Sequence, residues 1–395
     1  MLVLPLDEAE PGARLAAGIW HPEHPEQELL KAGFVLDQTV LHRLRQLGVA
    51  SIYVDYPDLS ELDKHLIPAL SPERQRIYQQ IKRTIAAVER TAKPSVTFPD
   101  YYVATRQLVI TLLSQGPHAI YMEHLASRLP TDEISHATAV AHLSLMLGIR
   151  LEQYLIRQRS RLDPAHAKEV VNLGIAGMLH DIGKARLDPA SRAACGIDRP
   201  DDPEIAEAYE THPQLGYDMV RGGIESSAAG AILQHHQHYD GSGFPRLITK
   251  RAPDEPLHGE QIHVFARIVA LANRFDRLAT DPTTGRRREN IETLALLTRD
   301  HADQLDPVVL KILPSVVPPF PPGSKLKLSD DTHAVVIGVD PADPYAPSLR
   351  RLIRDDSGVA RVDGTPFKVS DKPELQIESI NGVDVEAHRA PVGVA

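Results

Sequence analysis

Residues 166–184 read HAKEVVNLGIAGMLHDIGK, an apolar stretch that ends on His180, Asp181 and Lys184. The apolar residues ahead of His180 predict a helix buried inside a helical protein. At its end, a histidine nitrogen stands beside a carboxylate, and a carboxylate can bridge two cations. The helix dipole also favours His and Lys at a C-terminus without any metal. The stretch alone therefore leaves two interpretations open, a metal site and an ordinary helix end.

Two further histidines favour the metal site. His136 shares the apolar face of a predicted helix with Val140, Leu143 and Leu147, where an unpaired imidazole would be costly to bury. His212 precedes a proline at a predicted helix start. A single buried histidine is usually a core residue with a hydrogen-bond partner, but several at the ends of successive helices indicate ligands.

His235 and His236 open the stretch HHQHYDGSGFP, 235–245. Adjacent side chains on a helix diverge by about 100°, so both reach one metal only where the helix ends. The DGSG turn predicts that it does end there. Histidine and carboxylate ligands without thiolate suit Fe, Mn or Zn. Two such ions about 3.5–4 Å apart can hold a phosphodiester and activate water.

Composition narrows the function classes. The 395 residues predict two or three domains, and 43 basic against 53 acidic residues give a net charge of −10. That balance argues against a DNA-binding or membrane-surface protein, whose footprint is basic. Cys195 is the only cysteine, which excludes an intrachain disulfide and predicts a reducing, cytoplasmic location. We expect neither a signal peptide nor a membrane span.

The chain divides by pattern into four parts. Residues 1–65 predict a small α/β module, with a helix whose apolar residues are Val40, Leu44 and Leu47. Ser71 and Pro72 predict the start of a connecting helix within 66–100. Residues 101–320 read as helices throughout, among them 227–236 and 260–279, and residues 321–385 predict a β-rich extension, interpreted as a hairpin. The predicted fold class is mainly α, a helical bundle with a small N-terminal α/β module and a short C-terminal β appendage.

The motifs together resemble those of a known family. HDIGK at 180–184, HPxxGY at 212–217 and HHxxxDGxGxP at 235–245 are similar in order and spacing to the HD-GYP domain, a branch of the HD-domain metal phosphohydrolases. GEQIHVFARIVALANRFDRLAT at 259–280 resembles the helix that follows, and PPGSKLKLSD at 321–330 resembles a segment near the domain end. The resemblance covers residues 105–340 approximately. The N-terminal module is similar, more weakly, to one often placed ahead of such domains.

This resemblance implies an HD-type helical bundle that holds two or three metal ions, often Fe or Mn, and hydrolyses cyclic di-GMP. Asp181 would bridge the ions, Lys184 would contact phosphate, and Asp240 and Gly241 would belong to the signature loop. Asp181 and Lys184 are then the expected catalytic residues. The implied metal ligands are His136, His180, Asp181, His212, His235, His236 and Asn273.

Four departures from the family pattern put activity in question. Gln237 stands where the family has Glu, and Phe244 replaces Tyr of the Gly-Tyr-Pro motif. Asn273 replaces a ligand Asp, so we expect one sound metal position and one weakened one, and hence one or two ions per chain. Asp276 would substitute only if its helix rotated. The Arg that follows in the family is missing. Arg286, in GRRRE at 285–289, is the candidate that replaces it in binding substrate, and the alternative is a solvated basic turn.

The preferred prediction is a metal-dependent phosphodiesterase for cyclic di-GMP or a related cyclic dinucleotide. One alternative is a degenerate relative that binds nucleotide or a partner protein as a signalling adaptor, with little turnover. Another is a phosphohydrolase for a different nucleotide, because the lost Arg loosens the substrate assignment. The expected partners are a cyclic dinucleotide and either a second copy of the chain or a signalling protein.

Overall fold

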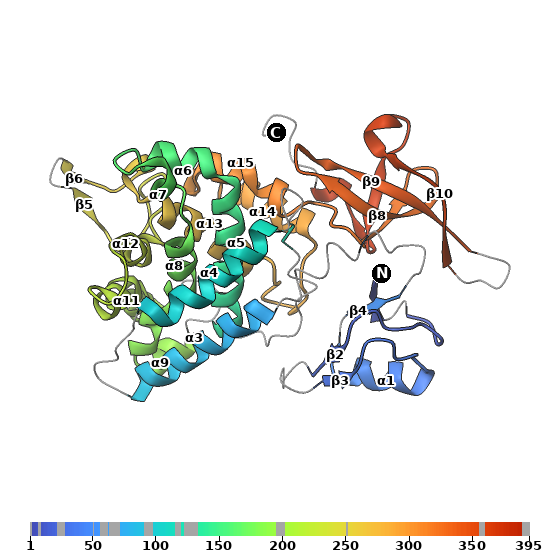
Figure 1. Ribbon diagram of the computed structural model, residues 1–395, viewed down its shortest axis with the longest axis horizontal. Coiled ribbons are helices and arrows are strands. Elements are labelled where there is room, and N and C mark those ends of the chain that lie inside the picture. Colours follow the sequence, from blue (N-terminus) through green and yellow to red (C-terminus); the bar gives the residue numbers. More distant parts are fainter. Residues whose placement is uncertain are drawn as a thin grey trace.

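The computed structural model describes residues 2–6, 9–21, 28–49, 51–55, 62, 72–90, 98–114, 120–121, 133–194, 202–249, 252–354 and 360–388. Within these residues, the chain forms a large helical body, a small N-terminal α/β module and a C-terminal antiparallel sheet (Figure 1). The predicted fold class, mainly α with two smaller β-containing parts, is confirmed.

Most of the chain between residues 72 and 316 lies in the helical body. Its helices are α3 (Pro72–Arg90), α4 (Phe98–Ser114), α5 (Glu133–Arg150), α6 (Glu152–Gln158), α7 (Pro164–Ala167), α8 (Val171–Leu179), α9 (Pro189–Ala194), α10 (Pro203–Glu210), α11 (His212–Val220), α12 (Ser226–Gln234), α13 (Val264–Leu278), α14 (Asn290–Asp300) and α15 (Pro307–Val316). A short hairpin, β5 (Ile248–Thr249) and β6 (Ala252–Pro256), projects between α12 and α13.

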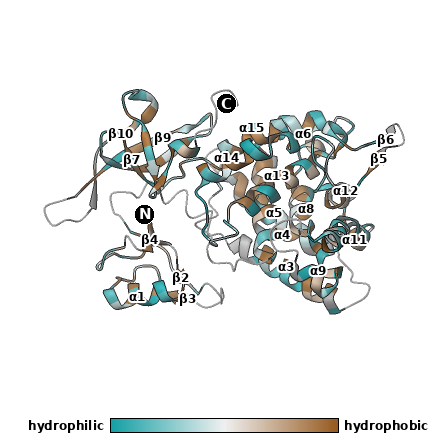
Figure 2. Cartoon of the chain, turned by 180° about the vertical axis from the view of Figure 1, so that it is seen from behind, coloured by the Kyte–Doolittle hydropathy of each residue, from teal (hydrophilic) through white to brown (hydrophobic). Residues whose placement is uncertain are grey.

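Helices α5 and α8 form the centre of this body and are predominantly hydrophobic (Figure 2). Every residue of α5 from His136 to Gly148 is buried, so the predicted apolar face extends around the whole helix. Gly177 of α8 permits the close approach of the two helices, since a Cβ there would lie 2.7 Å from the Cα of Ala141. A helix that is apolar on all sides needs partners on all sides, which α3, α4, α12 and α13 provide.

One sequence expectation for the helices needs correction. The single helix expected at 166–180 is two helices, because Asp163 caps the short α7 at Ala165 and His166 and the chain turns before α8. The connecting helix α3 packs its apolar face, Ile77, Ile81 and Val88, into the core of the helical body. Its predicted cap, Ser71, lies outside the described residues.

The N-terminal module pairs β1 (Leu2–Pro5) with β4 (Ser51–Val54) in antiparallel register, and β2 (Ile19–Trp20) with β3 (Glu28–Leu30). Helix α1 (Gln38–Gln46) covers them, capped by Asp37, whose side chain accepts a hydrogen bond from the Val40 amide at 2.7 Å. The face that α1 buries is Leu41 and Leu44, whereas the predicted Leu47 terminates the helix and is exposed.

The C-terminal part is a six-stranded antiparallel sheet, larger than the expected hairpin. Its strand order is β10-β9-β8-β7-β11-β12, with β7 (Lys325–Leu328), β8 (His333–Asp340), β9 (Asp343–Arg354), β10 (Ala360–Lys368), β11 (Ile377–Ile380) and β12 (Val383–Asp384). The sequence pattern did not indicate β9 because it contains Pro344 and Pro347, and proline within a run argues against a strand. Val335 of β8 packs into the core of the N-terminal module, and Ile291 of α14 packs against the opposite side of the sheet core.

No single helix among the described residues combines the length and the apolar character needed to cross a membrane. The bent pair α5 and α6 passes that test by length and composition only, and α5 is the central buried helix of the body.

A buried ion pair ties α13 to α15. Arg267 and Asp306 are both almost fully buried and in contact, and the Tyr154 hydroxyl of α6 donates to Asp306 Oδ2 at 2.6 Å. Asp306 also caps α15, since its Oδ1 accepts from the Val308 amide at 2.9 Å. The charge of Arg267 would therefore be left buried without its carboxylate if Asp306 were removed.

We expect Asp306→Ala to lower the free energy of unfolding by about 3–5 kcal/mol, the usual cost of stranding a buried charge. Urea unfolding followed by circular dichroism measures this loss. Asp303→Ala, at an exposed position in the preceding turn, is the matched control and should change stability by less than about 0.5 kcal/mol. Equal effects of the two substitutions would contradict a structural role for the buried pair.

Candidate metal centre

The ends of three helices bring the predicted ligands together. His180 follows the last residue of α8, His235 follows the last residue of α12, and His212 is the first residue of α11. The prediction that the helix ends at His235 is therefore confirmed, and His236 lies in the turn that follows. His136 comes from the first turn of the central helix α5.

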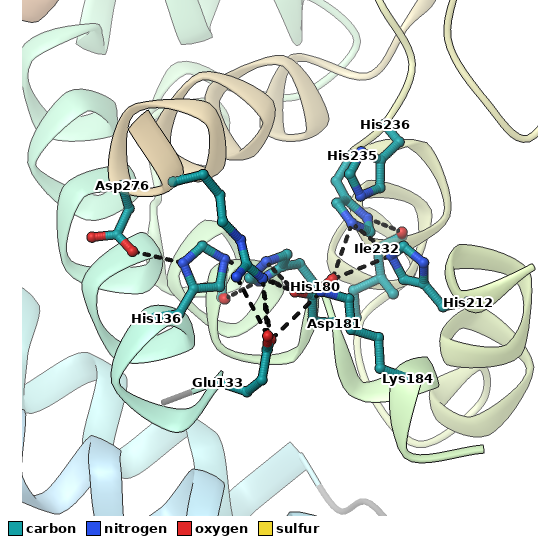
Figure 3. A network of polar contacts seen from close by, with 12 residues as sticks. Glu133, His136, His180, Asp181, Lys184, His212, Ile232, His235, His236 and Asp276 are labelled. Carbon is teal, nitrogen blue, oxygen red and sulfur yellow. Dashed lines mark hydrogen bonds and ion pairs between the residues drawn. The ribbon is translucent and has the colours of Figure 1, made fainter. Parts of the chain in front are cut away.

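Asp181 lies between two groups of side chains (Figure 3). Its Oδ1 is 3.2 Å from Nε2 of His212 and 3.7 Å from Nε2 of His235. Its Oδ2 is 3.3 Å from Nε2 of His180 and 3.9 Å from Nε2 of His136. Each carboxylate oxygen thus faces its own pair of imidazoles, the arrangement that a carboxylate shared by two cation positions requires.

Backbone carbonyls orient three of the imidazoles in the same way. Nδ1 of His180 lies 2.9 Å from the Gly177 oxygen, Nδ1 of His212 lies 2.6 Å from the Tyr209 oxygen, and Nδ1 of His235 lies 2.7 Å from the Ile232 oxygen. A carbonyl only accepts, so each Nδ1 carries the hydrogen and donates it. The neutral ring then presents the lone pair of Nε2 to the centre, as a metal ligand must.

The protonation states suit cation binding. Burial lowers the pKa of His235 to about 3, and it also lowers the pKa of His136 and of His212. Burial by itself raises the pKa of Asp181, but His180 and Lys184 outweigh it and hold that pKa well below the usual value of 3.8. At neutral pH the imidazoles of His136, His212 and His235 are therefore neutral and Asp181 is ionised, which are the forms that bind metal.

Two sets of atoms are close enough to hold an ion. One set comprises Asp181, His212, His235 and His236, and the other comprises His136, His180 and Asp181; within each set the ligand atoms lie within 4.8 Å of one another. The first set is a complete group of one carboxylate and three imidazoles and fits Fe, Mn or Zn. Nε2 atoms of His136 and His180 are buried and have no hydrogen-bond partner, so they also point to a ligand.

The second set lacks a further anionic ligand. Asn273 of α13 is buried and its Oδ1 has no hydrogen-bond partner, so a neutral oxygen stands at the sequence position where the family pattern has a carboxylate. Asp276 does not substitute for it, because its Oδ2 lies 2.6 Å from Nδ1 of His136. Asp276 therefore orients His136 through Nδ1, the ring nitrogen that does not face Asp181. This set fits a divalent ion less well than the first.

Glycines set the position of the loop after Asp181. A Cβ on Gly183 would lie 2.0 Å from the carbonyl oxygen of His212 and 2.6 Å from the amide nitrogen of Gly216. Only a residue without a side chain lets the loop pack this closely on the start of α11. The Gly of the HDIGK motif thus fixes the separation of Asp181 from His212.

The signature loop shapes a cavity beside His236. Phe244 stacks on the His236 ring at 4.4 Å, and the Gln237 amide donates to the Pro245 carbonyl at 2.6 Å. Asp240 accepts hydrogen bonds from Ser242 and is exposed, and Gly241 turns the chain with a φ of +87°. Asp240 and Gly241 thus form the turn of the loop, and the cavity beside it has a volume of about 570 Å³.

Positive side chains lie around the centre, only some of them expected from the sequence. Lys184 Nζ lies 2.7 Å from Asp181 Oδ2, and its place in the HDIGK motif made it recognisable. Arg246 and Arg274 line the cavity, and Arg277 contacts Asp181 at 3.2 Å; no motif marked these three. Arg286 instead pairs with Glu292 at 2.7 Å.

Comparison with known proteins agrees with this architecture. Residues 122–309 match the family model described as HD domain. A cyclic di-GMP phosphodiesterase of Pseudomonas aeruginosa is 26% identical over 333 residues, which cover 78% of this chain and 74% of the relative. The cyclic di-GMP phosphodiesterase response regulator RpfG of Xanthomonas campestris is 35% identical over 114 residues, 28% of this chain and 27% of that protein. A cyclic di-GMP phosphodiesterase of Thermotoga maritima is 30% identical over 114 residues, 28% of each chain.

The fold and the centre thus define a protein with an HD domain, which implies binding of a divalent metal. Its similarity to the HD domain model and to the relatives named cyclic di-GMP phosphodiesterases makes this chain HD-GYP-like. The resemblance expected from the motifs is confirmed.

The buried histidines predict a pH dependence of stability in the metal-free protein. Burial holds the pKa of His235 at about 3 and that of His263 at about 4, against 6.5 for an exposed imidazole. Below pH 6.5 the unfolded chain binds protons at these rings while the folded chain does not, so the free energy of unfolding falls with pH. Each such group contributes a slope of about 1.4 kcal/mol per pH unit between pH 6.5 and its folded pKa.

Urea unfolding of chelator-treated protein between pH 7 and 4.5 measures this slope. Asp181 and Asp276 do not contribute in that range, because the stability from a lowered carboxyl pKa is lost only below 3.8. His235→Asn should flatten the profile, and His258→Asn, at an exposed position, should not. Stability that stays constant down to pH 4.5 would contradict neutral buried imidazoles.

Proposed function

We propose that this protein is a metal-dependent phosphodiesterase that hydrolyses a cyclic dinucleotide, with cyclic di-GMP as the first candidate. The observation that carries the proposal is the position of Asp181, with one oxygen facing His212 and His235 and the other facing His180. The three curated relatives are named cyclic di-GMP phosphodiesterases, which supports the same reaction class. We also propose a cytoplasmic location, since a chain with one cysteine suits a reducing compartment.

A divalent metal would be held by Asp181, His212, His235 and His236. Bound there, it would supply Lewis-acid polarisation of a phosphate oxygen and a lower pKa for attacking water. His180 and His136 would form the weaker second position with the other oxygen of Asp181. Asn273 contributes a neutral oxygen to that position at most.

The side chains around these ligands would bind and orient the phosphodiester. Lys184 lies beside Asp181 and over the Tyr209 ring at 5.4 Å, where its charge can neutralise a phosphate oxygen. Arg246 and Arg274 line the adjoining cavity, so a second phosphate or a nucleobase edge would meet positive charge there. The cavity volume of about 570 Å³ lies within the range of about 300–1,000 Å³ usual for small-molecule sites.

A second candidate function is a signalling adaptor that binds the nucleotide or a partner protein with little turnover. The neutral Asn273 is the observation that favours it. In either case we propose that residues 101–320 carry the site, that residues 1–65 and 321–385 flank it as separate parts, and that residues 66–100 connect them. A second copy of the chain and a signalling protein remain the proposed partners.

The deciding experiment is turnover of cyclic di-GMP by the full chain loaded with Mn or Fe, followed by chromatography of the linear product. We expect hydrolysis, and we expect His180→Ala/Asp181→Ala to reduce it by at least about 10³-fold, because the shared carboxylate is lost. Binding of cyclic di-GMP without turnover would favour the adaptor. Turnover that survives the double substitution would refute the site.

The cavity predicts which residues bind substrate without holding metal. Arg274→Ala should weaken binding of cyclic di-GMP by about 10- to 100-fold, the usual loss for a charge-assisted hydrogen bond, with metal content unchanged. Isothermal titration calorimetry measures the affinity. Arg299→Ala, an exposed arginine on α14, is the matched control. Unchanged affinity in Arg274→Ala would place the nucleotide elsewhere.

A further inference from the structure

We infer that Arg277 takes the place of one metal ion in this centre, so that its guanidinium supplies the positive charge beside Asp181 Oδ2 and the chain holds a single divalent ion at the Oδ1 side. This inference rests on the proposed metal centre and goes beyond it. It assigns a role to a residue that none of the sequence motifs marked.

The contacts of Arg277 place its charge on the second metal position. Its Nη2 atom lies 3.2 Å from Oδ2 of Asp181 and 3.1 Å from Oε2 of Glu133. The same Oδ2 is 3.3 Å from Nε2 of His180 and faces His136 as well. A guanidinium is always charged and matches carboxylates well, so it can act as a fixed cation at this point.

Lys184 adds a second cation on the same side. Its Nζ lies 2.7 Å from Asp181 Oδ2 and 3.5 Å from Glu133 Oε2. Among the contacts of the described residues, both cations are therefore on Oδ2, whereas Oδ1 is paired with the imidazoles of His212 and His235. Oδ2 of Asp181 therefore faces the two cations, and Oδ1 faces two of the imidazoles that would bind metal.

The anions that a second divalent ion would need are engaged or absent. Asn273 is neutral, and Arg277 follows it by four residues, one turn along the same face of α13. Asp276 is directed to Nδ1 of His136. Glu133 is bound by Arg277 and Lys184.

A divalent ion at Oδ2 would therefore sit between two fixed positive charges with one shared carboxylate. Like charges at such short distances repel strongly in a buried site. Asn273 and Arg277, one turn apart on α13, thus act in the same direction. Asn273 provides no anionic ligand for a second ion, and Arg277 supplies positive charge at Asp181 Oδ2 instead.

This arrangement leaves the centre able to hold phosphate. A phosphate oxygen on the Oδ2 side would meet the guanidinium and the Lys184 ammonium, and on the Oδ1 side it would meet the metal held by His212, His235 and His236. Arg277 then acts as a positioning and charge-neutralising residue rather than as a proton donor.

The test is the number of metal ions bound by the full chain. Protein expressed with Mn²⁺ and dialysed should contain one Mn per chain by mass spectrometry of the metal, with the electron paramagnetic resonance spectrum of isolated Mn²⁺. Asn273→Asp/Arg277→Gln, which restores the carboxylate and removes the charge, should bind two ions and show the exchange-coupled spectrum of a pair. Arg299→Ala is the control and should remain at one.

Two tightly bound ions in the unsubstituted protein would overturn the inference, and so would one ion in the folded double variant. If the double variant fails to fold, calorimetric titration of the unsubstituted protein with Mn²⁺ still decides, because a second tight site contradicts the role of Arg277. The proposed function fails separately: one ion without hydrolysis of cyclic di-GMP supports Arg277 and refutes the enzyme. Two ions together with hydrolysis of cyclic di-GMP would refute the role of Arg277 and support the enzyme.

Discussion

The buried carboxylate of Asp181 is the group on which the organisation of this protein depends. An ionised carboxylate inside a helical core is very costly unless charges and hydrogen-bond donors surround it. Here Lys184 and Arg277 approach one oxygen and two imidazoles approach the other. The helices α5, α8, α11, α12 and α13 each contribute a residue to, or end beside, this one group.

The ends of the helices explain why the imidazoles of His180, His212 and His235 all direct Nε2 toward Asp181. The last carbonyls of a helix have no partner within the helix. Gly177 in α8, Tyr209 in α10 and Ile232 in α12 use these carbonyls to accept Nδ1–H of the histidine three residues later. Ending a helix therefore places the ring and selects its tautomer at the same time.

The centre is asymmetric because the two oxygens of Asp181 have different neighbours. On the Oδ1 side Asp181 shares a possible ligand set with three imidazoles, those of His212, His235 and His236. On the Oδ2 side two cations contact it beside the imidazoles of His136 and His180. The asymmetry arises from α13, which carries Asn273, Asp276 and Arg277 within five residues and presents them to the same region. A substitution at Asn273 or Arg277 would therefore change the charge beside Asp181 without replacing any of the ligands from α8, α11 and α12.

The sequence by itself determined the mainly helical class and the family resemblance. It also determined the set of histidines that meet at Asp181, because apolar periodicity and helix-end residues are local properties. It underestimated the C-terminal sheet, because Pro344 and Pro347 argue against a strand where β9 lies, and it wrongly placed Leu47 on the buried face of α1. Only the tertiary structure decided that Asp276 supports His136, that Arg286 pairs with Glu292 and that Arg277 reaches Asp181. These contacts join residues from separate helices or depend on which way a side chain extends, and spacing along the chain does not encode either.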